Sequence, residues 1–115
     1  MQLGEEQIEQ IKVYEFVKQN TDLPFIHIAN ERRTAPHKGL ILKRMGVLAG
    51  TSDIFIPRAT SRYHGVWIEL KTKSGKVSPH QLEFIQDMIK EGYYGQVCYG
   101  AEEAILLIKG LYLLS

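Results

Sequence analysis

The most informative stretch of this sequence is residues 63–72, which read Tyr-His-Gly-Val-Trp-Ile-Glu-Leu-Lys-Thr. Its centre is apolar except for Glu69, as expected for an inner strand that is covered on both faces. Side chains alternate along a strand, so Glu69 and Lys71 project from the same face, about 7 Å apart at their Cα atoms. Ile68 and Leu70 then point to the other face, into the core. We therefore predict a central strand that carries an acid and a base on one side.

Helical and extended segments surround this strand. A turn at 74–76 and a helix start signal at Ser78 predict a helix over 78–91, and a strand follows over 96–99. A strand, a crossover helix and a second strand form a parallel pair. The other predicted elements are helices over 5–19, 40–45 and 101–109 and strands over 25–28 and 53–57. This order predicts an α/β fold with a mixed central sheet flanked by helices, as one domain over residues 1–115.

The composition limits the classes of protein. The 115 residues suffice for one modest core, and 44% hydrophobic with 23% charged residues is an ordinary globular balance. No apolar run approaches the roughly 20 residues of a membrane span, and the acidic N-terminus does not resemble a signal peptide. The single cysteine, Cys98, excludes an internal disulfide, and no Cys/His cluster suggests zinc. We expect an intracellular protein with no membrane partner and no structural metal.

Positive charge is concentrated in the middle of the chain. Residues 25–80 carry ten Lys and Arg against three acids, a net charge of +7, whereas residues 1–24 and 81–115 each carry −3. A basic centre fits phosphate binding, although a mixed solvated surface can give the same pattern. The candidates for DNA contact are basic side chains of an irregular segment, which would follow phosphates without reading bases. They are Arg32, Arg33, Lys38, Lys43 and Arg44.

A second carboxylate changes the interpretation of the central strand. A lone Glu-x-Lys pair ordinarily makes cross-strand ion pairs, but Asp53 opens the preceding strand, within reach of Glu69. Two like charges repel at close range unless a cation lies between them, and oxygen ligands of this kind suit Mg²⁺ or Mn²⁺. Such an ion would activate water and a phosphodiester, and Lys71 would orient that water and stabilise charge on the phosphate oxygens. The alternative for Asp53 is a turn residue bonded to local backbone.

Three motifs together resemble the virus-type replication-repair nuclease (VRR-NUC) domain, a PD-(D/E)XK branch with a restriction-endonuclease-like core. They are Gly50-Thr51-Ser52-Asp53, Ile68-Glu69-Leu70-Lys71 and Ser78-Pro79-His80-Gln81, and the resemblance spans nearly the whole chain. It implies that Asp53 and Glu69 bind Mg²⁺ or Mn²⁺ with the Leu70 carbonyl as a further ligand, and that Lys71 is catalytic. It also implies a DNA endonuclease, encoded in some cases by a phage or prophage. Stand-alone members resemble Holliday-junction resolvases that act on branched DNA as homodimers.

The resemblance implies two further site residues. In the family a glutamine at this helix start lies beside the active site, which matches Gln81, although Gln81 also completes a capping box with Ser78. The family also places an acid of the first helix near the metal. Of Glu5, Glu6 and Glu9, we choose Glu6, because it lies on the stripe of the helix that we expect to face the sheet. The alternative is that all three are solvated acids favoured by the helix dipole.

Other functions stay open at this point. One is a nickase or flap-type repair nuclease, and another is a DNA-binding subunit with a degenerate site, against which the intact Asp53, Glu69 and Lys71 set counts. A domain with no nucleic-acid role fits the basic centre less well. The apolar C-terminal segments 106–108 and 111–114 are our candidate for a dimer surface, unless they pack across the sheet.

Overall fold

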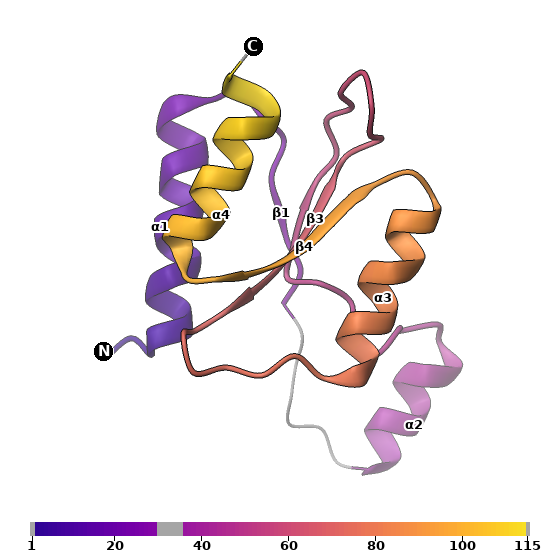
Figure 1. Ribbon diagram of the computed structural model, residues 1–115. Helices are drawn as coiled ribbons and strands as arrows, with labels where there is room; N and C mark the ends of the chain where they lie inside the picture. The colour runs from indigo at the N-terminus through magenta and orange to yellow at the C-terminus, as the bar shows by residue number, and fades with distance from the viewer. Residues whose placement is uncertain (1, 30–35, 115) are drawn as a thin grey trace.

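In the computed structural model the described residues are 2–29 and 36–114, and the side chains of residues 36–38 lie outside this description. A four-stranded mixed sheet forms the centre (Figure 1), in the strand order β1-β2-β3-β4. The strands are β1 (Ile26–His27), β2 (Ile54–Ile56), β3 (Val66–Lys71) and β4 (Tyr94–Tyr99). β2 is antiparallel to both β1 and β3, and β3 is parallel to β4. The predicted α/β class, the mixed sheet and the inner position of the 63–72 strand are confirmed.

Helices cover both faces of the sheet. They are α1 (Glu5–Asn20), α2 (Pro36–Arg44), α3 (Pro79–Lys90) and α4 (Ala101–Ile108), which continues into a π-helical segment η1 (Lys109–Leu113). Figure 1 shows α1 and α4 side by side on one face and α3 on the other, with α2 beyond α3. The predicted helix over 40–45 is wrong in its start, because α2 begins at Pro36, a residue suited to the first turn of a helix.

Side chains of β2 and β3 alternate between the two faces of the sheet, and the residues packed on the two faces differ in kind. One face places Ile54 opposite Ile68 and packs them against Val13 and Val17 of α1 and against Ala104 of α4. The other face, under α3, is aromatic. There Phe55 stacks on Trp67 with ring centroids 4.2 Å apart, and Phe84 of α3 meets the Trp67 ring edge-on at 4.9 Å. Glu69 and Lys71 continue the Trp67 face toward the end of β3, so the charged pair lies beside an apolar wall.

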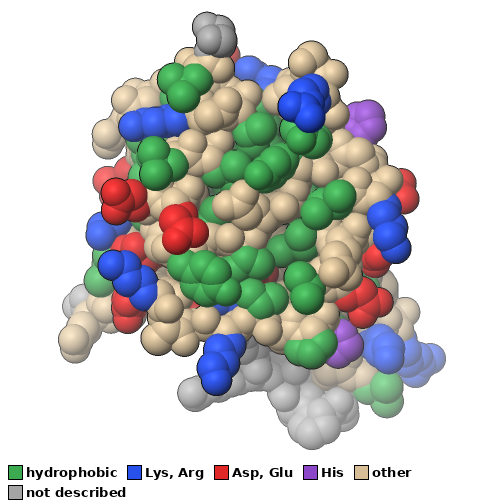
Figure 2. Space-filling model, viewed as in Figure 1, with side chains coloured by type: hydrophobic (Ala, Val, Ile, Leu, Met, Phe, Trp, Pro, Cys, Tyr) green, Lys and Arg blue, Asp and Glu red, His purple; other side chains and the backbone are tan. Residues whose placement is uncertain are grey.

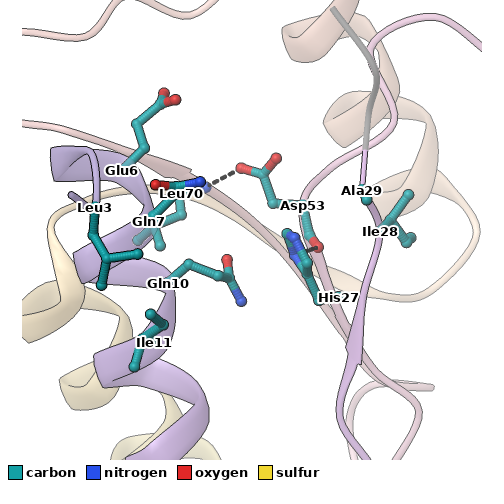
Figure 3. Close-up of a pocket in the computed structure, with 10 residues that line it drawn as sticks. All are labelled: Leu3, Glu6, Gln7, Gln10, Ile11, His27, Ile28, Ala29, Asp53 and Leu70. Carbon is teal, nitrogen blue, oxygen red and sulfur yellow. Dashed lines mark hydrogen bonds between the residues drawn. The ribbon is translucent and has the colours of Figure 1, made fainter. Parts of the chain in front are cut away.

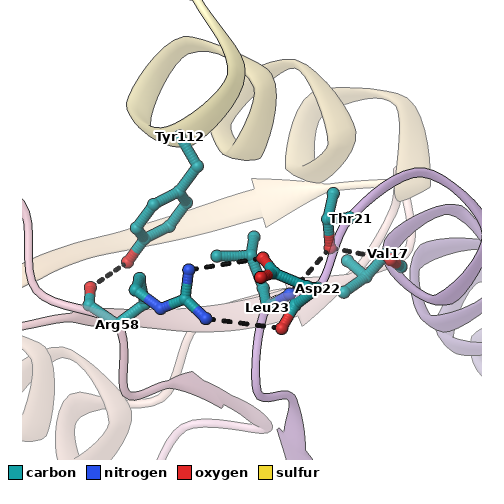
Figure 4. Close-up of polar contacts among 6 residues, drawn as sticks. All are labelled: Val17, Thr21, Asp22, Leu23, Arg58 and Tyr112. Carbon is teal, nitrogen blue, oxygen red and sulfur yellow. Dashed lines mark hydrogen bonds and ion pairs between the residues drawn. The ribbon is translucent and has the colours of Figure 1, made fainter.

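Polar contacts of Arg58 fix the β2–β3 connection at the end of the hairpin far from Glu69 and Lys71 (Figure 4). The Arg58 guanidinium contacts the Asp22 carboxylate at 3.3 Å, and the Tyr112 hydroxyl donates to the Arg58 carbonyl at 2.7 Å. Burial raises the pKa of Tyr112 to about 12, so the hydroxyl keeps its proton. These contacts connect the residues that follow α1, the β2–β3 connection and the C-terminal segment.

The apolar C-terminal segments serve mainly the core. Ile108 is fully buried, and Leu107 and Leu111 pack against the core cluster. Leu106 and Leu114 nevertheless keep 61% and 72% of their surface exposed. The packing alternative therefore accounts for most of these segments, and a few leucines are left on the outside.

Candidate active site

The central feature of the site is a pair of carboxylates on neighbouring strands. Ile54 pairs with Ile68, and the same antiparallel register, continued by one residue, places Asp53 opposite Glu69. The Asp53 carboxylate also accepts a hydrogen bond of 2.9 Å from the Leu70 backbone N–H. Asp53 is therefore held against β3 by its own side chain at the point where β2 begins, and the turn-residue alternative does not describe its bonding.

Glu69 is fully buried together with a buried base. The Lys71 ammonium group lies 3.7 Å from a Glu69 carboxylate oxygen, and the two side chains are 7% and 0% exposed. Burying a carboxylate and an ammonium group costs several kcal/mol per ion unless partners compensate for the lost water. Residues placed so unfavourably for stability are frequent at functional sites.

The start of α3 completes this cluster through Gln81. Ser78 caps the helix by accepting from the Gln81 backbone N–H at 3.2 Å, and the Gln81 side-chain oxygen accepts from the Ser78 backbone N–H at 3.0 Å. The other end of the same amide donates to the Glu69 carboxylate at 3.3 Å. The capping role and the place beside the site thus coexist in one side chain.

The loop before Asp53 is packed directly against this helix start. Gly50 has a φ of +86°, and a Cβ built there would overlap the His80 carbonyl group and lie 2.8 Å from the Gln81 backbone nitrogen. Only glycine permits both the left-handed backbone and this approach. Gly50 therefore sets the distance between the Asp53 loop and the helix that carries Gln81.

The acids of α1 differ in their surroundings. Glu6 lines a cavity together with Asp53 and Leu70 (Figure 3). Glu9 instead accepts from the Ala101 backbone N–H at 3.0 Å, at the start of α4, and pairs with Lys12 at 3.2 Å. The Ala101 N–H and then Lys12 hold the pKa of Glu9 below its ordinary value. Glu9 thus has a structural task, which leaves Glu6 as the acid of these two that lines the same cavity as Asp53.

Comparison with known families gives a direct assignment. A family model described as the VRR-NUC domain matches residues 3–102. The chain belongs to the VRR-NUC family. A solved structure titled "VRR_NUC domain protein" superposes with a TM-score of 0.79 at 27% sequence identity, covering 100% of this chain and 93% of that one. No curated protein gives a significant match. The predicted resemblance is confirmed, and the chain is a nuclease-type domain.

Two residues of this VRR-NUC domain that we did not predict as site residues lie beside Asp53. The cavity of about 550 Å³ that Glu6 lines is also lined by Gln10 and His27. The His27 imidazole Nδ1 donates to the Asp53 backbone carbonyl at 3.1 Å. Helical periodicity puts Gln10 on the same stripe as Glu6 but does not mark it as a site residue, and no local signal marks His27, whose position depends on how β1 pairs with β2. The antiparallel pairing of 25–28 with 53–57, had it been predicted, would have placed His27.

The predicted DNA contacts are only partly covered by the described residues. Lys43 and Arg44 end α2 and are exposed. Arg32 and Arg33 lie outside the described residues, and so does the side chain of Lys38. The structure therefore places the basic end of α2 on the surface and leaves the rest of that segment as a prediction.

The oxygen donors of this VRR-NUC domain fit a hard divalent cation. Within residues 2–29 and 36–114, no group of three or more His, Cys, Asp or Glu side chains could by itself hold a metal ion. Mg²⁺ does not need such a cage, because it keeps several waters and takes one or two carboxylates. Asp53 and Glu69 on adjacent strands match that requirement.

Among the helices described, none is long and apolar enough to span a membrane.

Proposed function

We propose that this VRR-NUC domain is a DNA endonuclease that hydrolyses phosphodiester bonds with Mg²⁺ or Mn²⁺. The observation that carries the proposal is the convergence of Asp53, Glu69, Lys71 and Gln81 at one end of the β2–β3 pair. Two of them are a buried carboxylate and a buried ammonium group 3.7 Å apart. A cluster of this kind is costly for stability, which supports a role in chemistry.

Asp53, Glu69 and the Leu70 carbonyl are the proposed metal ligands. N–H and C=O groups of one strand residue point toward the same neighbour. The Leu70 N–H donates to Asp53, and the Lys71 carbonyl accepts from Gly100 on the opposite side, so the Leu70 carbonyl faces the Asp53 side. A bound Mg²⁺ or Mn²⁺ supplies polarisation of the phosphodiester and a lower pKa for bound water.

The other residues of the site would orient the reacting groups and neutralise charge. Lys71 holds its positive charge beside Glu69, where it can direct a water molecule and stabilise charge that develops on the phosphate oxygens. Gln81 keeps the Glu69 carboxylate in one orientation through its amide. Glu6, across the cavity from Asp53, supplies a further acid toward the same ion. Positioning of this kind contributes strongly to rate because the reacting groups need no rearrangement.

The proposed substrate is branched DNA, such as a Holliday junction, cut by a homodimer. A four-way junction needs two incisions, and two copies related by a twofold axis would match its own near-twofold symmetry. Apolar side chains gather across the middle of the face seen in Figure 2, and Leu106 and Leu114 are exposed leucines available for pairing. The basic segment, Arg32, Arg33, Lys38, Lys43 and Arg44, would follow the phosphates.

The test is cleavage of a panel of labelled DNA structures with Mg²⁺, Mn²⁺ or a chelator. We expect cutting of branched DNA with either ion and none with chelator. Asp53→Asn is the matched variant, since it removes the negative charge and keeps an oxygen acceptor for the Leu70 N–H. It should keep the fold and lose cleavage. A protein that binds these structures and cuts none of them is a degenerate DNA-binding subunit instead.

Assembly is tested with a cruciform plasmid and light scattering. A dimeric resolvase gives linear product from two coupled incisions. A monomer at micromolar concentration that yields nicked circles and no linear product would identify a nickase. Replacing Arg32 and Arg33 with alanine should weaken binding to all sequences alike and reduce its salt dependence, and an unchanged salt slope would place the phosphate contacts elsewhere.

A further inference from the structure

One side of the helix α2 is apolar and exposed. The opposite side lines a groove of about 640 Å³ between α2 and α3, to which Leu42 and Lys43 contribute. At about 100° per residue, Leu40, Ile41 and Met45 point away from that groove, and they keep 64%, 51% and 73% of their surface exposed. In the described part of the chain, no other helix or strand packs closely against α2, which Figure 1 shows beyond α3. Large apolar side chains gathered on one exposed side are typical of an interaction surface.

The outer face of α2, which consists of Leu40, Ile41, Arg44 and Met45, has positive charges and no acid of its own segment. Arg44 lies within the face and Lys43 beside it, and both are exposed. Residues 32–52 contain no aspartate or glutamate. Two copies of this face related by a twofold axis would therefore set like charges against each other. DNA supplies the negative charge that the segment lacks, so the face is complementary to a nucleic acid.

The groove side of α2 differs from the outer face in charge. Glu83 and Asp87 of α3 line the groove opposite Lys43. A phosphate in the groove would meet these two acids, whereas one at the outer face would meet Arg44. The outer face is thus the side of α2 that suits DNA.

The outer face is also tied to the proposed active site by a short connection. Asp53 follows Met45 by eight residues, so at most about 28 Å of chain separates them. This reach is less than one turn of duplex DNA, about 34 Å. Gly50 of the connection packs against the start of α3, which carries Gln81. DNA that has its cleaved phosphodiester at Asp53 can therefore extend to the outer face.

We propose that the outer face of α2 is a wedge that places Leu40, Ile41 and Met45 against the bases at a DNA branch point, while Lys43 and Arg44 contact the flanking phosphates. Leucine, isoleucine and methionine are among the side chains that DNA-bending proteins insert between bases. Insertion costs less where the stack is already interrupted, so the wedge favours branched over continuous DNA. The inference rests on the proposed nuclease function and assigns the choice of substrate to residues outside the carboxylate cluster.

The test uses a double variant, Leu40→Gln with Ile41→Gln, which removes the apolar contacts and keeps good helix formers at exposed positions. Branched and linear DNA of the same sequence carry 2-aminopurine at the branch position, and binding is followed by its fluorescence with chelator present. We expect wild type to raise the fluorescence of the branched DNA, because the base leaves the stack, and the variant to leave it unchanged. The Kd of the variant should rise roughly tenfold for branched DNA and less than about twofold for linear DNA.

The control variant is Ile89→Gln on α3, because Ile89 is exposed to the same extent as Ile41, 51%. It should bind and unstack the branched DNA as wild type does. Equal fluorescence for the double variant and wild type overturns the proposal.

Two further measurements identify other occupants of the outer face. A dimeric wild type and a monomeric double variant in light scattering would assign the face to a second copy of the chain. Loss of binding to anionic lipid vesicles, with DNA binding unchanged, would assign it to a membrane surface. Either result overturns the wedge.

The fluorescence measurement does not depend on catalysis, so the two proposals fail separately. Branched DNA that wild type unstacks but never cuts with Mg²⁺ or Mn²⁺ would refute the nuclease function and keep the wedge. Branched DNA that wild type and the double variant cut equally well, with no change in fluorescence, would refute the wedge and keep the nuclease function.

Discussion

The Gln81 side-chain amide joins a helix cap to a buried carboxylate. Its oxygen accepts from the Ser78 backbone N–H at 3.0 Å, and its nitrogen donates to Glu69 at 3.3 Å. The orientation of the amide is thereby set at both ends, because exchanging oxygen and nitrogen would lose both bonds. The conformation of Glu69 consequently depends on where α3 begins.

This dual role separates two variants that have similar effects on the helix. Ser78→Ala removes the cap and should lower the free energy of unfolding by about 1 kcal/mol, with cleavage preserved because the Gln81 amide still reaches Glu69. Gln81→Ala should lower stability by a similar amount and also reduce kcat by at least tenfold. Denaturant titration and single-turnover cleavage measure the two effects. Equal cleavage by both variants would show that Gln81 is only a cap.

Asp53 has a structural bond as well as a proposed metal role. Relief of like-charge repulsion alone predicts that Asp53→Ala leaves the metal-free protein as stable or more so. The bond to the Leu70 N–H makes us expect the opposite, a loss of about 1–3 kcal/mol, because a part-buried donor loses its acceptor. Asp53→Asn keeps an acceptor oxygen and should stay within about 1 kcal/mol of wild type. Both variants should lose cleavage by orders of magnitude. A metal-free Asp53→Ala protein as stable as wild type would contradict the structural role.

Gly50 and Gly46 form a matched pair for testing the packing of the site. Both have positive φ, but a Cβ at Gly46 meets nothing within 4 Å, whereas one at Gly50 overlaps the start of α3. Gly46→Ala should cost about 1–2 kcal/mol for the backbone alone. Gly50→Ala should cost about 1–3 kcal/mol more and should also slow cleavage, since α3 must move away with Gln81. Unfolding curves that coincide for the two variants would argue against the close contact.

The Glu9 contact predicts a specific pH dependence. The folded-state pKa of Glu9 is lower than its ordinary value of 4.5, chiefly through the Ala101 N–H, so the carboxylate stabilises the fold above that pH and ceases to do so as pH falls through the folded-state pKa. Glu9→Gln should cost about 0.5–1 kcal/mol near neutral pH, and the difference from wild type should shrink below pH 4.5. Glu15→Gln, on the exposed side of the same helix, is the control. A difference that stays constant with pH would mean that the charge of Glu9 has no part in it.

Local signals were sufficient for much of the fold. The capping box at Ser78 predicted a helix over 78–91, and α3 runs from Pro79 to Lys90. Alternation in the 63–72 stretch correctly divided Glu69 and Lys71 from Ile68 and Leu70: the last two belong to the core cluster under α1 and α4, whereas the face of Trp67 lies under α3. Of the predicted 25–28 strand, Ile26 and His27 pair with β2, and the Ile28 N–H donates to the carbonyl of Asp53, the residue just before β2.

The site was predictable where its residues are local in sequence or belong to a family motif. Asp53, Glu69, Lys71 and Gln81 are of this kind, and the structure brings them together. Gln10, His27 and the bond from Leu70 to Asp53 were not predicted, because each depends on the packing of segments distant in sequence. Glu6 and Glu9 show the same limit, since helical periodicity favoured Glu6 but could not reveal that Glu9 caps α4.

The site is divided along the chain in a way that matters for its evolution. The four polar residues at its centre lie in one continuous stretch, 53–81, whereas Gln7, Gln10 and Ile11 of the cavity wall come from α1. Substitutions of the apolar residues on that side of α1 can therefore reshape the cavity without touching Asp53 or Glu69. Selection could retune the space beside the carboxylates through a single helix while the hydrolytic apparatus is inherited unchanged.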